Sequence, residues 1–364
     1  MYVAVSQVAR SNHEQRNLGA PVRAPPTRIA PLPLHKRGRD MLLLLGNGVA
    51  PSRCSIPIMS GSSSPQRVVA LDLDGVICDS EPELTTRAWR ATCELWPDVM
   101  GATAELGPKT AGARRAWAKG NWSPLEGVSA EGLPNWLAAK MRILRPVLET
   151  GYDSMLMMRL CADEALAAGP GKRPLTPGEI QANWGPELRD TLSVRYGLQA
   201  EEAIERYSTA LDTWRADDPN GWLSANRFYE GAVDALRAAV ADNSAAVHVL
   251  TAQETHVAQG LLRIAELPIE EDRVISLHGG GEKALVLAEL RQRHPDAQLA
   301  YVEDRVPVLR TMANEVSLFA CELYFAQWGH STPEQQAAAA SMPRVRALGP
   351  DSSELARALR GVEN

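Results

Sequence analysis

The apolar residues follow two different patterns along the chain, and the pattern changes near residue 226. Between Ser80 and Asn226 they recur at helical spacing, and no stretch has the alternation of a good strand. From Tyr229 onward, helical stretches alternate with short apolar runs, at 247–250, 274–277, 299–302, 317–325 and 344–348. Such an alternation predicts an α/β fold with a doubly wound parallel sheet.

One further apolar run, 68–71, precedes the helical stretch. We therefore assign 67–81 and 226–364 to one α/β core and 82–225 to a helical insertion. Most of the nine tryptophans lie in this insertion: Trp89, Trp96, Trp117, Trp122, Trp136, Trp184, Trp214 and Trp222. We expect them to pack in its interior, because Trp side chains contribute much of the buried area of a core.

Local signals mark several helix starts. Ser80 and Glu83 have the spacing of a capping box, which predicts a helix beginning between them. Thr176 precedes a proline, and Glu179 follows at the third helical position, which predicts another helix start.

Composition excludes several classes of function. The chain has 364 residues, 45% of them apolar, and a net charge of −6, which does not suggest a nucleic-acid partner. No apolar run approaches the length of a membrane span. The five cysteines form no C-x-x-C pair, so neither a zinc site nor a disulfide framework is indicated, and a reducing compartment is favoured.

The first 66 residues differ in charge from the rest of the chain. They hold eight basic residues and two acidic ones, a net +6, so the remainder carries −12. They also contain several prolines and the serine run 62–64. This composition predicts a disordered transit peptide, with the chloroplast favoured over the mitochondrion. The alternative is a start of translation at Met59 and a cytoplasmic protein.

Candidate chemistry begins directly after the run 68–71. Asp72 and Asp74 are one residue apart and precede Gly75, so both carboxylates can lie on one side of the strand end. Two carboxylates that close repel each other unless a positive charge lies beside them. Mg2+ suits such a place, because it prefers oxygen ligands.

Other polar residues follow the later apolar runs. Thr251 comes after 247–250, the Glu303–Asp304 pair comes after 299–302, and Lys283 opens a helix after a glycine run. Ligands of open α/β sheets bind at the carboxyl ends of the strands. The four sites are therefore expected to converge at one edge of the sheet.

The order of these residues resembles the four motifs of the haloacid dehalogenase superfamily. The pattern D-x-D-G-V-I-x-D-S at 72–80 resembles the first motif, and Thr251, Lys283 and Glu303–Asp304 resemble the next three. The resemblance extends from Arg67 to about Phe325. It implies a Rossmann-like core with an inserted helical cap, here larger than the family's common small cap.

The resemblance also implies a role for each catalytic residue. Asp72 would be the nucleophile that takes the phosphoryl group, and Asp74 the general acid and then the base for water. Thr251 would hydrogen-bond the phosphoryl oxygens. Lys283 would neutralise the nucleophile and the transferring phosphate.

A metal site and a cap contact complete these implications. Mg2+ would be held by the side chains of Asp72, Glu303 and Asp304 and by the backbone carbonyl of Asp74. A cap that closes over a phosphate needs a cation, and Arg145 is the candidate among Lys140, Arg142 and Arg145, because Pro146 places it at a helix end. A solvated basic helix face is the alternative reading of these three residues.

Two positions depart from the family pattern. Arg305 follows the acidic pair, where small residues are common. Ala252 and Gln253 follow Thr251, where other members often have Asn, so the partner on the phosphate side is open.

The function expected from these residues is that of a Mg2+-dependent phosphatase, a hydrolase acting on the phosphate monoester of a small metabolite. One alternative is a sugar-phosphate mutase, because mutases share the first motif and the helical cap. A second is a non-catalytic binding protein on the same fold. The sequence does not encode the substrate or the oligomeric state.

We predict that residues 1–66, fused to a fluorescent protein, carry it into an organelle, because a basic, acid-poor start is typical of transit peptides. The measurement is microscopy of the fusion beside the fluorescent protein alone. A diffuse cytosolic signal from the fusion would reject the targeting assignment.

Overall fold

The computed structural model describes residues 65–106, 130–169, 171–277 and 280–361. All of them belong to one unit, Gly61–Asn364. The expected transit peptide lies outside the described residues, apart from its last two positions.

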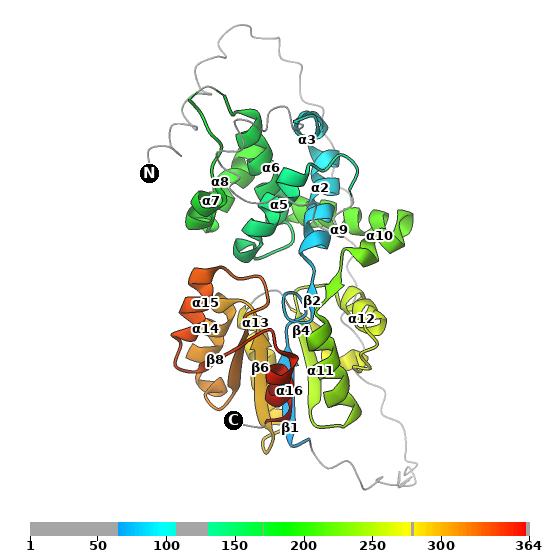
Figure 1. Ribbon diagram of the computed structural model, residues 1–364, viewed down its shortest axis with the longest axis vertical. Helices are drawn as coiled ribbons and strands as arrows, with labels where there is room; N and C mark the ends of the chain where they lie inside the picture. Colours follow the sequence, from blue (N-terminus) through cyan, green and yellow to red (C-terminus); the bar gives the residue numbers. More distant parts are fainter. Residues whose placement is uncertain (1–64, 107–129, 170, 278–279, 362–364) are drawn as a thin grey trace, which may run out of the picture. The chain divides into compact units, whose positions relative to one another are not determined.

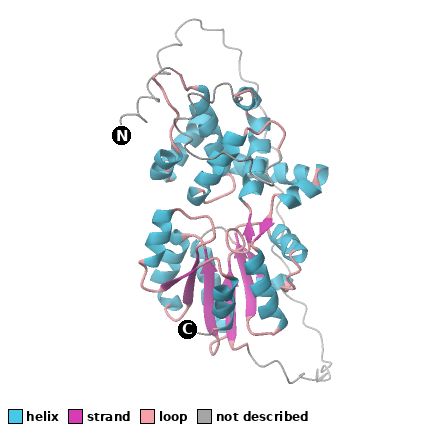
Figure 2. Cartoon of the chain, viewed as in Figure 1, coloured by secondary structure: helices cyan, strands magenta, loops and turns pink. Residues whose placement is uncertain are grey.

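The core is one six-stranded sheet (Figures 1 and 2). Every neighbouring pair in it is parallel, in the order β5-β4-β1-β6-β7-β8. The strands are β1 (Arg67–Leu71), β4 (Ala246–Thr251), β5 (Val274–Ser276), β6 (Gln298–Glu303), β7 (Glu322–Ala326) and β8 (Val345–Leu348). The first strand therefore lies in the middle of the sheet, between two strands that come more than 170 residues later.

Alternate residues of the central strand enter two separate hydrophobic clusters. Val69 and Leu71 pack with helices α11 (Glu230–Ala241), α12 (Thr255–Ile264) and α16 (Ser352–Arg360). Val68 and Ala70 pack with α13 (Gly280–Arg293), α14 (Val306–Asn314) and α15 (Pro333–Ala340). Successive strand residues point to opposite faces, so both faces of the sheet are covered, as in a doubly wound fold.

The insertion leaves and re-enters the core through a two-stranded ribbon, β2 (Cys78–Asp79) paired antiparallel with β3 (Arg227–Phe228). Figure 2 shows helices and loops between these strands. The helices are α2 (Glu81–Leu95), α3 (Pro97–Ala104), α5 (Asn135–Leu144), the short 3-10 helix η2 (Arg145–Val147), α6 (Asp153–Leu166), α7 (Pro177–Asn183), α8 (Pro186–Tyr196), α9 (Ala200–Asp217) and α10 (Pro219–Ser224). The predicted fold class, an α/β core with an inserted helical domain, is confirmed.

The described tryptophans of the insertion mostly contribute to packing. Trp214 is fully buried, and Trp89 and Trp222 are nearly so. Trp96, Trp136 and Trp184 pack at the margin of the insertion's hydrophobic cluster. Two more, Trp117 and Trp122, lie outside the described residues.

Two local predictions were wrong in detail. Helix α2 starts where expected, but the Ser80 side chain makes no capping bond, because its backbone is not extended there. Asp79 Oδ1 accepts from the Glu81 N–H instead, at 3.3 Å. By contrast, Thr176 and Glu179 form the predicted capping box.

The strand expected over 317–325 begins later, at Glu322. The preceding residues form a 3-10 turn, Val316–Leu318, because the Glu315 carboxylate accepts from the Ser317 N–H at 3.2 Å. No helix among the described residues is both long and apolar enough to span a membrane.

Candidate functional site

The carboxyl ends of three adjacent strands place the predicted residues at one edge of the sheet. Strand β1 ends at Leu71, which lies beside Val249 of β4 and Val302 of β6. The next residue, Asp72, continues this pairing, since its N–H donates to the Val302 carbonyl at 3.0 Å. Asp72, Thr251 and Glu303 therefore emerge side by side, as the alternation of strands and helices predicted.

A tight loop follows β1, and glycine is required in it. The N–H groups of Ile77 and Cys78 both donate to the Leu73 carbonyl at 2.9 Å. Gly75 has a φ of +83°, and a Cβ there would lie 1.9 Å from Asp304 Oδ2. Only a residue without a side chain allows this loop to pack against the acidic pair.

Lys283 joins the first and last acidic positions. Its Nζ lies 3.1 Å from Asp72 Oδ2 and 3.0 Å from Glu303 Oε2. Burial alone would lower the pKa of Lys283, but the two carboxylates raise it well above its usual range. A first-turn lysine in α13 opposes the helix dipole, and these two buried carboxylates explain its position.

The two carboxylates that share Lys283 differ electrostatically. Burial raises the pKa of Asp72 well above its usual range. The Lys283 charge lowers this pKa in part, and the Glu303 charge adds to the rise. Burial would also raise the pKa of Glu303, yet Lys283 and the Tyr301 hydroxyl, which donates at 2.6 Å, lower it to about 2. Glu303 therefore remains ionised, and Asp72 is the group whose charge responds to its surroundings.

Asp72, Glu303 and Asp304 form a cluster suited to a cation. One oxygen from each lies within 4.8 Å of the others, and all three side chains are buried. Asp304 Oδ1 has no hydrogen-bond partner among the described residues. Burial and the neighbouring Glu303 charge raise the pKa of Asp304 to about 8. Buried carboxylate oxygens that repel one another fit a hard divalent cation such as Mg2+.

Asp74 and Thr251 meet through a residue that the sequence left open. Gln253 Nε2 donates to Asp74 Oδ1 at 3.1 Å. The Gln253 N–H in turn donates to Thr251 Oγ1 at 3.1 Å. The loop after β4 therefore holds the second aspartate of the first motif.

Arg145 lies on η2 within electrostatic reach of the cluster. Its charge lowers the pKa of Asp304, an effect smaller than the rise caused by burial. Its guanidinium donates to the Leu148 carbonyl at 3.3 Å, and its Nε has no hydrogen-bond partner among the described residues. The structure thus places Arg145 near the acidic pair without a direct bond to it.

Sequence reasoning missed a second buried network beside the site. Arg142, passed over in favour of Arg145, lies 2.7 Å from Asp79 Oδ2 and 3.3 Å from Glu81 Oε2. His330 Nε2 lies 2.9 Å from Asp79 Oδ1, and the His330 N–H donates to Asp304 Oδ2 at 2.7 Å. Asp79 thus links an insertion helix to the loop that holds Asp304.

The charges of this network are fixed by burial and by pairing. Burial opposes ionisation of Asp79, but His330 and Arg142 together lower its pKa well below the usual range. Burial, and then the Arg145 charge, lower the pKa of His330 to about 4. Asp79 could have been found from the sequence, because it belongs to the motif at 72–80. No sequence motif included His330.

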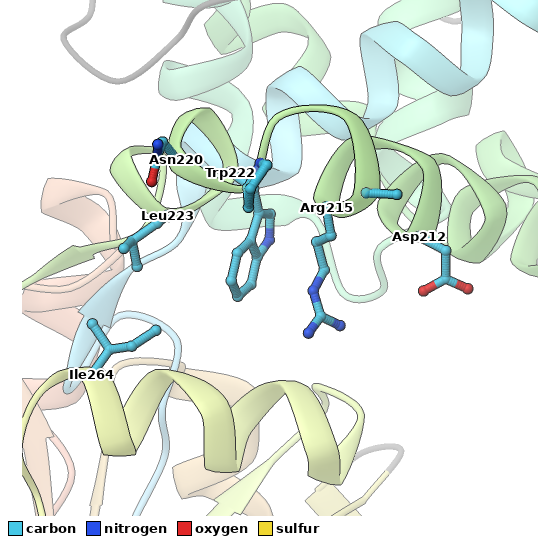
Figure 3. A pocket seen from close by; sticks show the side chains of 8 residues that line it. Asp212, Arg215, Asn220, Trp222, Leu223 and Ile264 are labelled. Atoms are coloured by element: carbon cyan, nitrogen blue, oxygen red, sulfur yellow. The ribbon is translucent and has the colours of Figure 1, made fainter.

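A cavity of about 430 Å³ lies away from this cluster, lined by residues of α9, α10 and α12 (Figure 3). Figure 3 shows Trp222 and Arg215 beside each other in it, with the guanidinium 4.9 Å from the ring centre. None of the site residues predicted from the sequence belongs to its lining.

Known proteins resemble this chain only distantly. No protein-family model and no curated protein sequence matches the chain. Among solved structures, the chain is similar to one described as a "predicted phosphatase" from Clostridium acetobutylicum, at 14% identity and a TM-score of 0.40, covering 82% of this chain and all of that one. A haloacid dehalogenase-like family hydrolase from Xanthomonas campestris has 14% identity and a TM-score of 0.34, covering 82% and 96%. Likenesses this distant carry no conclusion about activity.

We expect Mg2+ to stabilise the chain more at pH 8.5 than at pH 6.5. Asp304 has a folded pKa of about 8 and an ordinary value of 3.8, so the folded, metal-free chain binds more protons than the unfolded chain between these values. Its stability therefore falls as pH rises through this window. A cation removes the repulsion and needs the ionised carboxyl. Saturating Mg2+ at pH 8.5 should raise the melting temperature by about 5 °C.

The measurement is thermal unfolding with and without Mg2+ at both pH values. Asp304→Asn should lose most of the Mg2+ effect. Asp242→Asn removes an exposed carboxylate that does not belong to the cluster, and it should keep the Mg2+ effect. An equal Mg2+ effect in Asp304→Asn and in the unaltered chain would contradict the site.

Proposed function

We propose that the chain is a Mg2+-dependent phosphatase that hydrolyses the phosphate monoester of a small metabolite through an aspartyl-phosphate at Asp72. The observation that supports this most is the buried Asp72 carboxylate, which lies 3.1 Å from Lys283 and in one cluster with Glu303 and Asp304. An anionic nucleophile can approach an anionic phosphate only where such positive charge is concentrated.

Asp72 is the group oriented for attack. Its Oδ1 accepts from the Leu73 N–H at 2.8 Å, and its Oδ2 faces Lys283. In the first step one Asp72 oxygen forms a bond to phosphorus, and the bond between phosphorus and the alcohol oxygen breaks. Lys283 stabilises the charge that develops during this transfer. In the second step a water oxygen bonds to phosphorus and frees the Asp72 carboxylate, so phosphate leaves.

Asp74 moves the proton in both steps. It gives a proton to the departing alcohol oxygen and then takes one from the attacking water. Its hydrogen bond from Gln253 fixes the carboxyl in one orientation. The Thr251 hydroxyl is proposed to donate to the phosphoryl oxygens, and Arg145 to approach the bound ester from the insertion.

The side chains of Asp72, Glu303 and Asp304 and the backbone carbonyl of Asp74 would hold Mg2+. When bound, Mg2+ would offset the negative charge of the phosphate and of the three carboxylates. The orphaned Asp304 Oδ1 is the atom that most needs such a partner. The small phosphorylated metabolite as partner and an organellar location for the mature chain belong to the same proposal.

We expect Asp72→Asn and Asp74→Asn each to lower kcat for phosphate-monoester hydrolysis by at least about 10²-fold. The first removes the nucleophile, and the second removes general acid–base catalysis, worth about 10²–10⁴-fold. The assay measures phosphate release by residues 65–364 with Mg2+ across a panel of phosphorylated metabolites. The exposed variant Asp242→Asn is the matched control.

Full activity in both variants would contradict the mechanism. Conversion of a sugar phosphate to its isomer without phosphate release would replace the phosphatase by the mutase. Full biological function of Asp72→Asn would instead favour a non-catalytic role.

We expect Gln253→Leu to slow alkyl esters more than p-nitrophenyl phosphate. An alkoxide leaves poorly and needs the Asp74 proton, whereas p-nitrophenolate leaves without one. Hydrogen bonds to charged groups contribute about 1.5–3 kcal/mol, so the alkyl rate should fall about 10- to 100-fold. The measurement is kcat for both esters, with Gln259→Leu on α12 as the control. Equal losses on both esters would show that Gln253 does not position the general acid.

A further inference from the structure

The loop that follows strand β7 packs directly on Asp304. Gly329 of this loop lies so close that a Cβ on it would be 2.3 Å from the Asp304 Cβ. The next N–H along the chain, that of His330, donates to Asp304 Oδ2 at 2.7 Å. Trp328 Nε1 donates to the Val76 carbonyl at 3.1 Å, which attaches the same loop to the one after β1. The orientation of the Asp304 carboxylate therefore depends on how this loop is held.

The His330 N–H determines which oxygen of Asp304 stays free. It occupies Oδ2, whereas Oδ1 has no hydrogen-bond partner among the described residues. A carboxylate that is held by one oxygen presents the other in a fixed direction. A group that bonds a metal ligand without touching the metal usually changes metal affinity when it is lost. The direction of this N–H is in turn set by the contacts that anchor the loop.

The His330 ring supplies one of these anchors. The ring is buried, and its Nε2 lies 2.9 Å from Asp79 Oδ1. An ionised carboxylate can only accept, so Nε2 carries the proton of this bond. Asp79 also binds Arg142 of α5, whose Nη1 lies 2.9 Å from Oδ1 and 2.7 Å from Oδ2. A continuous chain of short polar contacts therefore leads from the insertion to the group that holds Asp304.

Arg142 is well suited to fix the far end of this chain. Its guanidinium lies between two buried carboxylates, since Glu81 Oε2 is 3.3 Å away on the side opposite the Asp79 bond. Removing one partner of a buried ion pair leaves the other charge uncompensated, so Asp79 is held firmly only while Arg142 is present. The Arg142 side chain itself is 38% exposed, so replacing it leaves no hole in a hydrophobic core.

We infer that Arg142, Asp79 and His330 are positioning residues that set the Mg2+ affinity of the site through the loop after β7. The inference rests on the proposed Mg2+ site and goes beyond it, because none of the three side chains is a proposed ligand. The helical insertion thus contributes to metal binding although it supplies no ligand. Loss of any link leaves the acidic cluster in place but orients Asp304 Oδ1 less well.

Charge alone predicts the opposite effect for Arg142. A cationic side chain repels a bound cation, so its removal would tighten Mg2+ binding if only its charge mattered. If Arg142 acts by holding Asp79, its removal weakens Mg2+ binding instead. The sign of the change therefore distinguishes positioning from simple electrostatics.

The test is calorimetric titration of the full chain with Mg2+. We expect His330→Phe, which keeps a ring but removes the bond to Asp79, to weaken Mg2+ binding by at least about tenfold. His330→Gln, whose amide can donate to Asp79, should retain most of the affinity. Arg142→Met should weaken binding about 2- to 30-fold. Arg159→Met removes another close ion pair of the insertion, that with Asp163 at 2.9 Å, and should leave the affinity unchanged.

A double variant tests whether the two residues act along one chain of contacts. Arg142→Met combined with His330→Phe should weaken Mg2+ binding no more than His330→Phe alone, because the first residue acts through the second. Melting temperatures without Mg2+ show whether each variant folds. If His330→Phe does not fold, the sign of the change in the partly exposed Arg142→Met decides.

Each outcome bears on one claim. Unchanged or tighter Mg2+ binding in Arg142→Met would refute the role of the insertion, and unchanged binding in His330→Phe would refute the inference as a whole while the Mg2+ site stands. Losses that multiply in the double variant would show that Arg142 acts by a separate route. Absence of Mg2+ binding by the unaltered chain would overturn the metal site and this inference together. Mg2+ binding without phosphate release from any ester would contradict the proposed function alone.

Discussion

The repulsion among three buried carboxylates at the end of the central strand is the constraint on which the rest of the site depends. Asp72, Glu303 and Asp304 lie within 4.8 Å of one another, with one ammonium, that of Lys283, between two of them. Charges brought out of water are tolerated only when they are paired or bound to a metal. The Lys283 ammonium offsets the negative charge of Glu303 and part of the charge of Asp72. Asp304 is left with an orphaned oxygen and a raised pKa, which is the place for a cation.

The surrounding backbone is organised to keep this arrangement. Gly75 and Gly329 both approach Asp304 so closely that a Cβ on either would overlap its side chain. The His330 N–H then fixes one Asp304 oxygen, and the His330 ring continues to Asp79, where Arg142 of the insertion binds. The helical insertion is therefore tied electrostatically to the same edge of the sheet that carries Asp72.

The sequence predicted the fold and the convergence of the main residues for a simple reason. Strand ends are local features, and the parallel sheet turns their positions into proximity. Arg142, His330 and Gln253 were missed because their roles depend on how loops and helices fold back over that edge. A histidine two residues after Trp328, or a glutamine after Thr251, looks like any loop residue until its partner is known. The capping box at Ser80 failed for the same reason, because Asp79 took over the capping bond while serving the buried network.

The central claim, that Asp72 carries the phosphoryl group, is tested most directly by chemical trapping. Borohydride added during turnover reduces an aspartyl-phosphate to homoserine, and peptide mass spectrometry locates the change. We predict homoserine at position 72 alone, dependent on substrate and on Mg2+, and none at position 74. Unmodified Asp72 during active turnover, or the same change at another carboxylate, would contradict the account.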